Sequence, residues 1–113
     1  MTDTRLDRTF AALADPSRRR VIELLRQRPR RAGELAEAVD LSPPAMSRHL
    51  RVLRKTGFVE EGALEDDARV RVYRLKRSPF SALRSWLDEV EGFWGDQLAS
   101  FKEHAEKRAR RRP

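Results

Sequence analysis

The feature of this sequence that most constrains its fold is a pair of short helical patterns separated by a three-residue break. The first pattern covers residues 32–39 and the second covers residues 43–56, with Gly57 as its stop. Ser42 is a favourable N-cap, and Pro43 suits the first helical position because the N–H that it lacks has no helical partner there. Two short helices joined by so tight a turn are typical of a helix-turn-helix, whose second helix enters the major groove of DNA.

Each of these two helices has an apolar face at helical spacing. The residues on the faces are Leu35, Ala38 and Val39 in the first helix and Met46, Leu50 and Leu53 in the second. The other side of the second helix is polar and basic, so we expect it to contact DNA. The expected DNA-binding residues in and beside this helix are Ser42, Pro44, Ser47, Arg48, His49, Arg51 and Lys55.

Several of these residues have more than one open role. Arg48 and Arg51 are suited to a bidentate contact with guanine, and equally to a contact with a phosphate. Ser42 would be favourable as an N-cap even without DNA. His49 lies beside the apolar face, where a phosphate contact and a helix-packing contact are both open.

The charge balance agrees with a nucleic-acid partner, although an excess of arginine on solvated helix faces would give the same balance. The 113 residues include 25 Lys and Arg against 18 Asp and Glu, which gives a net charge of +7. Such a basic balance is expected of proteins that bind the phosphate backbone. The sequence has no cysteine, no apolar run of membrane-spanning length and no apolar stretch typical of a secretory signal. We therefore expect a cytoplasmic protein with no membrane partner and no thiolate metal site.

Two further helices are predicted before the helix-turn-helix. The first covers residues 3–14, and the second starts at Pro16, with Asp15 as its cap, and ends before Pro29. Their apolar faces consist of Leu6, Phe10 and Leu13 in the first helix and Val21, Ile22 and Leu25 in the second.

The pattern changes from helical to alternating after the second helix of the motif. Residues 58–64 and 69–75 are rich in β-favouring side chains and flank a polar tip at 65–68, so we predict a hairpin. A hairpin in this position is a wing. Arg69 and Arg71 lie on its second strand, and we expect both to contact DNA.

A last helix is predicted over about residues 79–107. Its apolar residues recur at the 3.5-residue spacing of a coiled coil. They are Phe80, Leu83, Leu87, Val90, Trp94 and Phe101, widened by Trp86, Phe93 and Leu98. Because one small domain cannot easily cover so much apolar surface, we expect a second copy to bury it, although the aromatic residues would also suit a ligand pocket. We assign residues 1–107 to one domain and predict that residues 108–113 form a disordered basic tail.

Three segments of the sequence resemble the ArsR/SmtB family of winged helix-turn-helix repressors. They are ADPSRRRVIELL, GELAEAVDLSPPAMSRHLRVLRKTGFVE and RVRVYRL, and the resemblance covers residues 10–75. The segment FSALRSWLDEVEGFWGDQLASF is similar to the last helix of a metal-free subgroup. The resemblance implies a mostly α fold with a small β-hairpin, in the order ααααββα. It also implies a homodimer whose interface is formed by the first and last helices of each chain. The implied interface residues are Leu6, Phe10, Leu83, Trp86, Leu87, Val90, Phe93, Trp94, Leu98 and Phe101.

The sequence departs from the metal-sensing members of that family. Arg31 and Gly33 occupy the positions of a Cys-x-Cys metal site, and Val90 stands where a second type of site has a histidine. His104 is then isolated, and one histidine with distant carboxylates does not make a four-ligand zinc site. We therefore expect no metal and no cofactor. The acidic wing tip also differs from the basic or glycine-rich tip that is usual in the family.

Together these patterns predict a repressor that binds double-stranded DNA as a homodimer, at a palindromic operator in its own operon. The sequence lacks a glycine-rich phosphate loop and a Ser-His-acid set, so we do not expect an enzyme. Three alternatives stay open: a repressor released by a metal or small molecule, a sequence-neutral nucleic-acid-binding protein, and a protein-interaction module. The sequence does not identify an effector.

Overall fold

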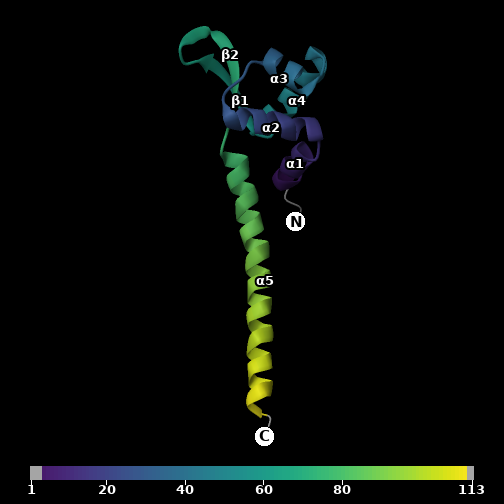
Figure 1. Ribbon diagram of the computed structural model, residues 1–113, viewed down its shortest axis with the longest axis vertical. Coiled ribbons are helices and arrows are strands. Elements are labelled where there is room, and N and C mark those ends of the chain that lie inside the picture. Colours follow the sequence, from purple (N-terminus) through teal and green to yellow (C-terminus); the bar gives the residue numbers. More distant parts are fainter. Residues whose placement is uncertain (1–3, 112–113) are drawn as a thin grey trace. The chain divides into compact units, whose positions relative to one another are not determined.

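The computed structural model describes residues 4–111, which form five helices and one two-stranded hairpin (Figure 1). The elements are α1 (Thr4–Leu13), α2 (Pro16–Gln27), α3 (Ala32–Val39), α4 (Pro43–Lys55), β1 (Val59–Leu64), β2 (Asp67–Leu75) and α5 (Ser78–Arg111). The predicted order, four helices, a hairpin and a long helix, is confirmed. Residue 3, predicted to begin the first helix, and residues 112–113, predicted to end the tail, lie outside the described range.

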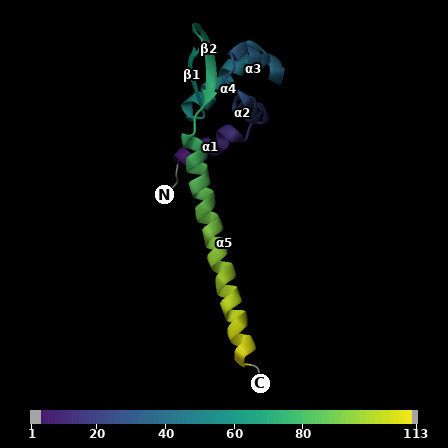
Figure 2. The same ribbon diagram turned by 60° about the vertical axis from the view of Figure 1, so that its left-hand side comes forward.

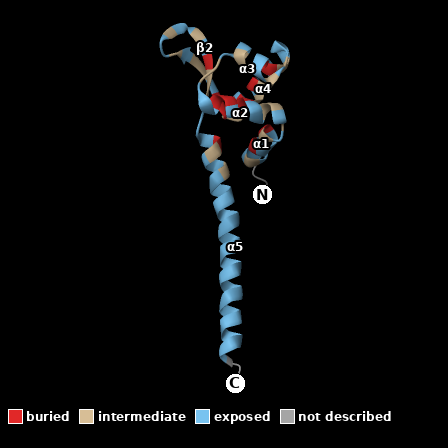
Figure 3. Cartoon of the chain, in the orientation of Figure 1, coloured by how far each residue is buried: buried red, intermediate tan, exposed pale blue. Residues whose placement is uncertain are grey.

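The chain divides into two units, one ending at Ser81 and the other beginning at Ala82 within α5. All residues that are buried in the described range belong to the first unit (Figure 3). Its apolar core consists of Ala12, Val21, Ile22, Leu24, Leu25, Leu35, Ala36, Met46, Leu50, Leu53, Phe58, Val59 and Val72. The predicted apolar faces of α2 and α4 are therefore confirmed.

The apolar faces of α1 and α3 are rotated from their predicted positions. In α3, Ala36 is buried beside Leu35, whereas Ala38, which was predicted to be buried, is exposed. The buried face is rotated in this way because α3 packs against both α2 and α4. In α1, Thr9 and Ala12 are the buried residues, and the Thr9 hydroxyl donates to the Arg5 carbonyl at 2.9 Å. Of the predicted face of α1, Phe10 is exposed, whereas Leu6 and Leu13 are partly covered.

The turn between α3 and α4 is fixed by local backbone contacts. Asp40 adopts a left-handed conformation with φ 59°, and the N–H of Leu41 then donates to the Ala36 carbonyl at 2.9 Å. This bond closes the C-terminus of α3. The Ser42 hydroxyl accepts from the Ala45 N–H at 3.3 Å, which caps α4 as predicted. The helix-turn-helix therefore arises from residues next to each other in the sequence.

The wing is an antiparallel hairpin that lies beside α4 in both views (Figures 1 and 2). A register shift after Ala63 pairs Leu64 with Asp67, so β2 starts two residues earlier than predicted and the tip contains only residues 65–66. Arg30 exchanges two backbone hydrogen bonds with Tyr73, at 2.8 and 3.2 Å, which ties β2 to the segment after α2.

Phe58 forms a buried corner just before β1, although it was predicted to begin the strand. Its carbonyl accepts from the Lys76 N–H at 2.9 Å, and its ring meets that of Phe80 edge-on at a centroid distance of 5.0 Å. The left-handed φ of 79° at Gly57 permits this corner, and only glycine adopts such a φ without strain. The two ends of the wing are thereby joined to each other beside the core.

The helix α5 is longer than predicted. It continues through Arg111, so residues 108–111 are helical rather than part of a disordered tail. Alanine, lysine and arginine favour helix, and no breaker occurs before Pro113. From residue 82 to residue 110 none of its side chains is buried. No helix in the described part of the chain has the length and apolar character needed to cross a membrane.

Candidate nucleic-acid interface

The outer face of α4 carries most of the side chains that were predicted to bind DNA. Because Met46, Leu50 and Leu53 face the core, the residues between them point outward. The exposed predicted residues in and beside α4 are Ser42, Pro44, Ser47, Arg48, Arg51 and Lys55. This surface holds three cations and two hydroxyl groups within four helical turns.

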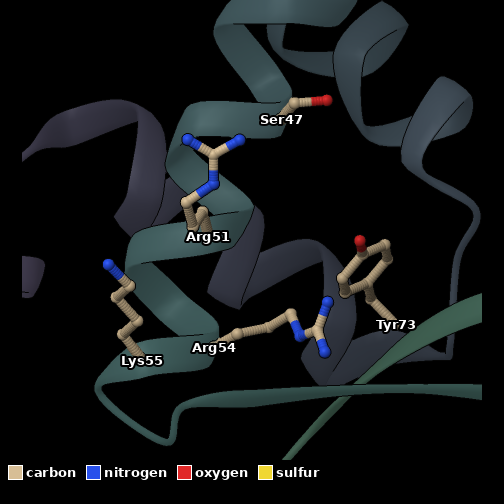
Figure 4. Close-up of a pocket in the computed structure, with 5 residues that line it drawn as sticks. All are labelled: Ser47, Arg51, Arg54, Lys55 and Tyr73. Carbon is tan, nitrogen blue, oxygen red and sulfur yellow. The ribbon is translucent and has the colours of Figure 1, made fainter.

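A groove of about 520 Å³ separates part of this face from the wing (Figure 4). Its lining residues are Ser47, Arg51, Arg54 and Lys55 of α4 and Tyr73 of β2. Figure 4 shows the Arg54 side chain extending from α4 towards Tyr73. Neither Arg54 nor Tyr73 was among the residues predicted to bind DNA. Arg54 follows Ser47 and Arg51 at i+7 and i+3, a spacing that would have identified it, whereas no local signal indicates Tyr73.

Glu61 of β1 connects the end of α4 with the wing. Its Oε2 accepts from Arg54 Nη1 at 3.2 Å and from the Tyr73 hydroxyl at 3.4 Å, and its Oε1 accepts from Arg71 Nε at 3.4 Å. Burial raises the pKa of the Tyr73 phenol, and the negative charge of Glu61 adds to the rise. One carboxylate thus holds two guanidinium groups and a phenol at the edge of the groove.

The two wing arginines that were predicted to bind DNA both contact acidic side chains. Arg69 Nε lies 3.3 Å from Asp67 Oδ1 with the arginine side chain 91% exposed, and Arg71 is 59% exposed beside Glu61. Ion pairs at such exposed positions contribute little to stability. Both guanidinium groups therefore lie at the surface, and their contact with DNA stays a prediction.

His49 differs from the other predicted residues of α4 because it faces a neighbouring helix. Its Nδ1 lies 3.2 Å from Nη1 of Arg18 in α2. A guanidinium group has only donors, so Nδ1 accepts and the ring proton resides on Nε2. This contact favours the helix-packing role that the sequence had left open for His49, while the Nε2–H stays available as a donor.

Along α1 and α5, most side chains predicted for the dimer interface are exposed in the single chain. The exposed ones are Phe10, Trp86, Leu87, Val90, Phe93, Trp94, Leu98 and Phe101, whereas Leu6 and Leu83 are partly covered. Phe93 and Trp94 meet edge-on at a centroid distance of 5.7 Å. Such a row of large apolar side chains at the surface is unusual unless a partner covers it.

The family to which the chain belongs follows from comparison with known proteins. Residues 15–61, which include α2, α3 and α4, match the model of the arsR family of bacterial regulatory proteins. The HTH-type transcriptional regulator Rv2034 of Mycobacterium tuberculosis is 38% identical over 95 residues, which cover 84% of this chain and 83% of that protein. The chain belongs to the ArsR family. The resemblance found in the sequence is thereby confirmed.

Two further regulators are similar to this chain. The transcriptional repressor SdpR of Bacillus subtilis is 32% identical over 56 residues, which cover 50% of this chain and 62% of that protein. An ArsR-like transcriptional regulator from Rhodococcus sp. RHA1 has a solved structure with a TM-score of 0.78 and 28% identity, over 95% of this chain and 98% of that one.

A more distant likeness concerns the fold alone. The homodimeric winged helix-turn-helix DNA-binding domain of Mb0332 from Mycobacterium bovis, solved by NMR, has a TM-score of 0.60 and 22% identity. The match covers 81% of this chain and 88% of that one. As an ArsR-family transcriptional regulator, the present chain therefore has α3 and α4 as its helix-turn-helix and β1 and β2 as its wing.

Between residues 4 and 111, no group of three or more His, Cys, Asp or Glu side chains is arranged to hold a metal ion. The side chains that gather at the groove are hydrogen-bond donors and cations instead, which are groups that bind phosphate and base edges.

Proposed function

We propose that this ArsR-family regulator is a cytoplasmic repressor that binds a palindromic operator near its own gene as a homodimer and has no enzymatic activity. The observation that carries the proposal is the exposed face of α4. Ser47, Arg48 and Arg51 lie on this face, and the opposite face of the helix is packed in the core. The name of the relative SdpR, a transcriptional repressor, agrees with this role.

In this proposal, α4 enters the major groove and supplies the sequence preference. Arg48 and Arg51 donate to guanine O6 and N7, and Ser47 lies beside them on the same face. Ser42 and Pro44 lie at the N-terminus of α4, where the positive end of the helix dipole favours a phosphate and the Ser42 hydroxyl can donate to it. Lys55, His49 Nε2, Arg69 and Arg71 contact further phosphates, which sets the affinity rather than the choice of sequence.

The homodimer is supported by the apolar row on α5. Val90, Trp94 and Phe101 follow a 3.5-residue spacing, as expected of a helix that packs along another helix. Mb0332, which shares the fold, is a homodimer, and we propose the same state here. A dimer presents two copies of α4, so its half-sites should lie about 34–36 Å apart, or a multiple of that distance.

Fluorescence anisotropy tests this function directly. A labelled fragment from upstream of the gene and a scrambled fragment are titrated with the protein at about 150 mM salt. A repressor of its own gene should prefer the upstream fragment by roughly a thousandfold, with one dimer per site. Equal affinity for the two fragments would indicate sequence-neutral binding instead. A change in affinity on adding Zn²⁺ would indicate a metal-responsive repressor.

A further inference from the structure

Glu61 is an acidic side chain placed among the cations of the proposed DNA-binding surface. Its side chain is 26% exposed, whereas the side chains of its partners Arg54 and Arg71 are 55% and 59% exposed. Arg54 lines the groove beside Arg51 and Lys55 (Figure 4). A DNA strand that lies along α4 and the wing would meet these cations and the carboxylate together.

The contacts of Glu61 are those that a phosphate would make. A guanidinium group has five N–H donors and binds carboxylate and phosphate oxygens with similar geometry. Arg54 donates to Glu61 through Nη1 and Arg71 donates through Nε. The carboxylate therefore accepts hydrogen bonds that a phosphodiester oxygen could otherwise accept. Glu61 therefore resembles an internal phosphate that bridges α4 and the wing.

The exposure of Arg54 and Arg71 indicates that their contacts with Glu61 can be exchanged for contacts with a phosphate, rather than serving only to stabilise the fold. The guanidinium groups of Arg54 and Arg71 are more than half exposed, so solvent screens their ion pairs with Glu61 and they can exchange partners at small cost. The carboxylate would also repel any phosphate that lies within the screening length of about 8 Å. Asp67 differs, because its partner Arg69 is two residues away on the same strand, whereas Glu61 contacts Arg54 and Tyr73, which both line the groove.

We propose that Glu61 competes with DNA phosphates for the guanidinium groups of Arg54 and Arg71, and that it thereby sets the specificity of this regulator. By weakening contacts with the backbone, which are the same for every sequence, Glu61 makes occupancy depend on the base contacts of α4. The proposal rests on the proposed function, since it concerns the same DNA-binding surface.

The test is the variant Glu61→Gln, which removes the charge and keeps the shape and an acceptor for Tyr73. The matched control is Glu23→Gln, because Glu23 forms an exposed ion pair with Arg26 at 3.2 Å on α2 and does not line the groove. Anisotropy titrations with the upstream and scrambled fragments at several salt concentrations give affinity and salt dependence for both variants, and melting curves verify that each is folded.

For Glu61→Gln we expect tighter binding to both fragments, by about three- to tenfold, with the larger gain on scrambled DNA. The slope of log K against log salt should steepen by up to about 2, since each of two released arginines can reach a phosphate. When Glu61→Gln is added to a variant that already carries Arg54→Gln and Arg71→Gln, the gain in affinity over that double variant should shrink to the gain that Glu23→Gln gives in the wild type.

Two results would overturn the proposal. Weaker binding by Glu61→Gln would mean that Glu61 positions the two arginines for DNA, and binding equal to that of Glu23→Gln would mean that it has no part in recognition. The proposed function is judged separately, from the preference of the wild-type protein for the upstream fragment. If that preference is absent, the effect of Glu61→Gln can still be measured on scrambled DNA.

Discussion

Arg18 Nη1 donates to His49 Nδ1 at 3.2 Å and so joins α2 to the proposed DNA-reading helix α4. The same guanidinium group donates through Nε to the Ala12 carbonyl at 2.7 Å and through Nη2 to the Ala11 carbonyl at 3.1 Å. These carbonyls lie at the C-terminal end of α1, where the Ala11 carbonyl also accepts from the Ala14 N–H at 3.2 Å. One side chain therefore holds three helices together.

Replacing this arginine should destabilise the fold. We expect Arg18→Ala to lower the free energy of unfolding by about 2–3 kcal/mol, because it removes three charged hydrogen bonds at a side chain that is only 17% exposed. Arg18→Lys should recover little, since an ammonium group cannot reproduce the planar fork. Urea denaturation measures the change. Arg26→Ala, at an exposed position on α2, serves as control, and equal losses for Arg18→Ala and Arg26→Ala would contradict this role.

Asp15 should make the stability depend on pH in the acidic range. Burial acts to raise the pKa of this carboxyl group, but the hydrogen bond from the Arg18 backbone N–H and the nearby guanidinium charge outweigh it, so the pKa is lowered. A lowered pKa in the folded state means that the cap stabilises the protein above the unfolded value of about 3.9 and loses this effect as the pH falls through the folded value.

The variant Asp15→Asn isolates this contribution, because asparagine caps a helix without titrating in this range. Between pH 5 and about pH 2, the wild type should lose about 1 kcal/mol more stability than Asp15→Asn. Urea midpoints at the two pH values give the difference. Equal losses in the two proteins would show that Asp15 does not contribute to acid sensitivity.

Arg48 tests whether the face of α4 reads bases. Arg48→Ala should reduce the preference for the upstream fragment by about 1–3 kcal/mol, because a bidentate contact with guanine is lost while most phosphate contacts remain. Anisotropy with the two fragments measures both affinities. Arg69→Ala on the wing should instead weaken binding to both fragments alike. An unchanged preference in Arg48→Ala would exclude this residue from base recognition.

Trp94 tests whether the apolar row of α5 joins two copies. Trp94 is 61% exposed in the single chain, so Trp94→Glu should have little effect on the fold of the monomer. In a helical dimer the carboxylate would be buried without a partner, and we expect the dimer to be weakened by roughly 100-fold. Analytical ultracentrifugation measures the dissociation constant. Ala99→Glu, which lies off the apolar row, is the control and should leave it unchanged.

Gly92 and Gly57 should respond in opposite ways to the same substitution. Nothing lies within 4 Å of a Cβ at Gly92, and this residue is about 200° around α5 from both Val90 and Trp94. Gly92→Ala should therefore stabilise the helix by about 1 kcal/mol. Gly57 has φ 79°, so Gly57→Ala should destabilise the fold by about the same amount. Thermal melts followed by circular dichroism measure both changes, and destabilisation by Gly92→Ala would indicate a close helix contact at that face.

The sequence was sufficient for those parts of the fold that depend on neighbouring residues. The start of α4 after Ser42 and its stop at Gly57 agree with the prediction, because a cap and a left-handed turn involve only a few adjacent residues. The buried residues of α4 also agree, because helical periodicity is regular. The rotated face of α3 differs, because a helix of eight residues is oriented by its neighbours rather than by its own pattern.

The contacts that define the candidate site lie beyond such local rules. The meeting of Arg18 with His49 depends on how α2 and α4 cross, and that of Glu61 with Arg54 depends on the register of the hairpin beside α4. Several arrangements of the same helices and strands satisfy the same sequence pattern, and side-chain packing in the core selects one of them. Short-range preferences thus account for which elements form, whereas long-range packing determines which side chains meet to build the surface proposed to bind DNA.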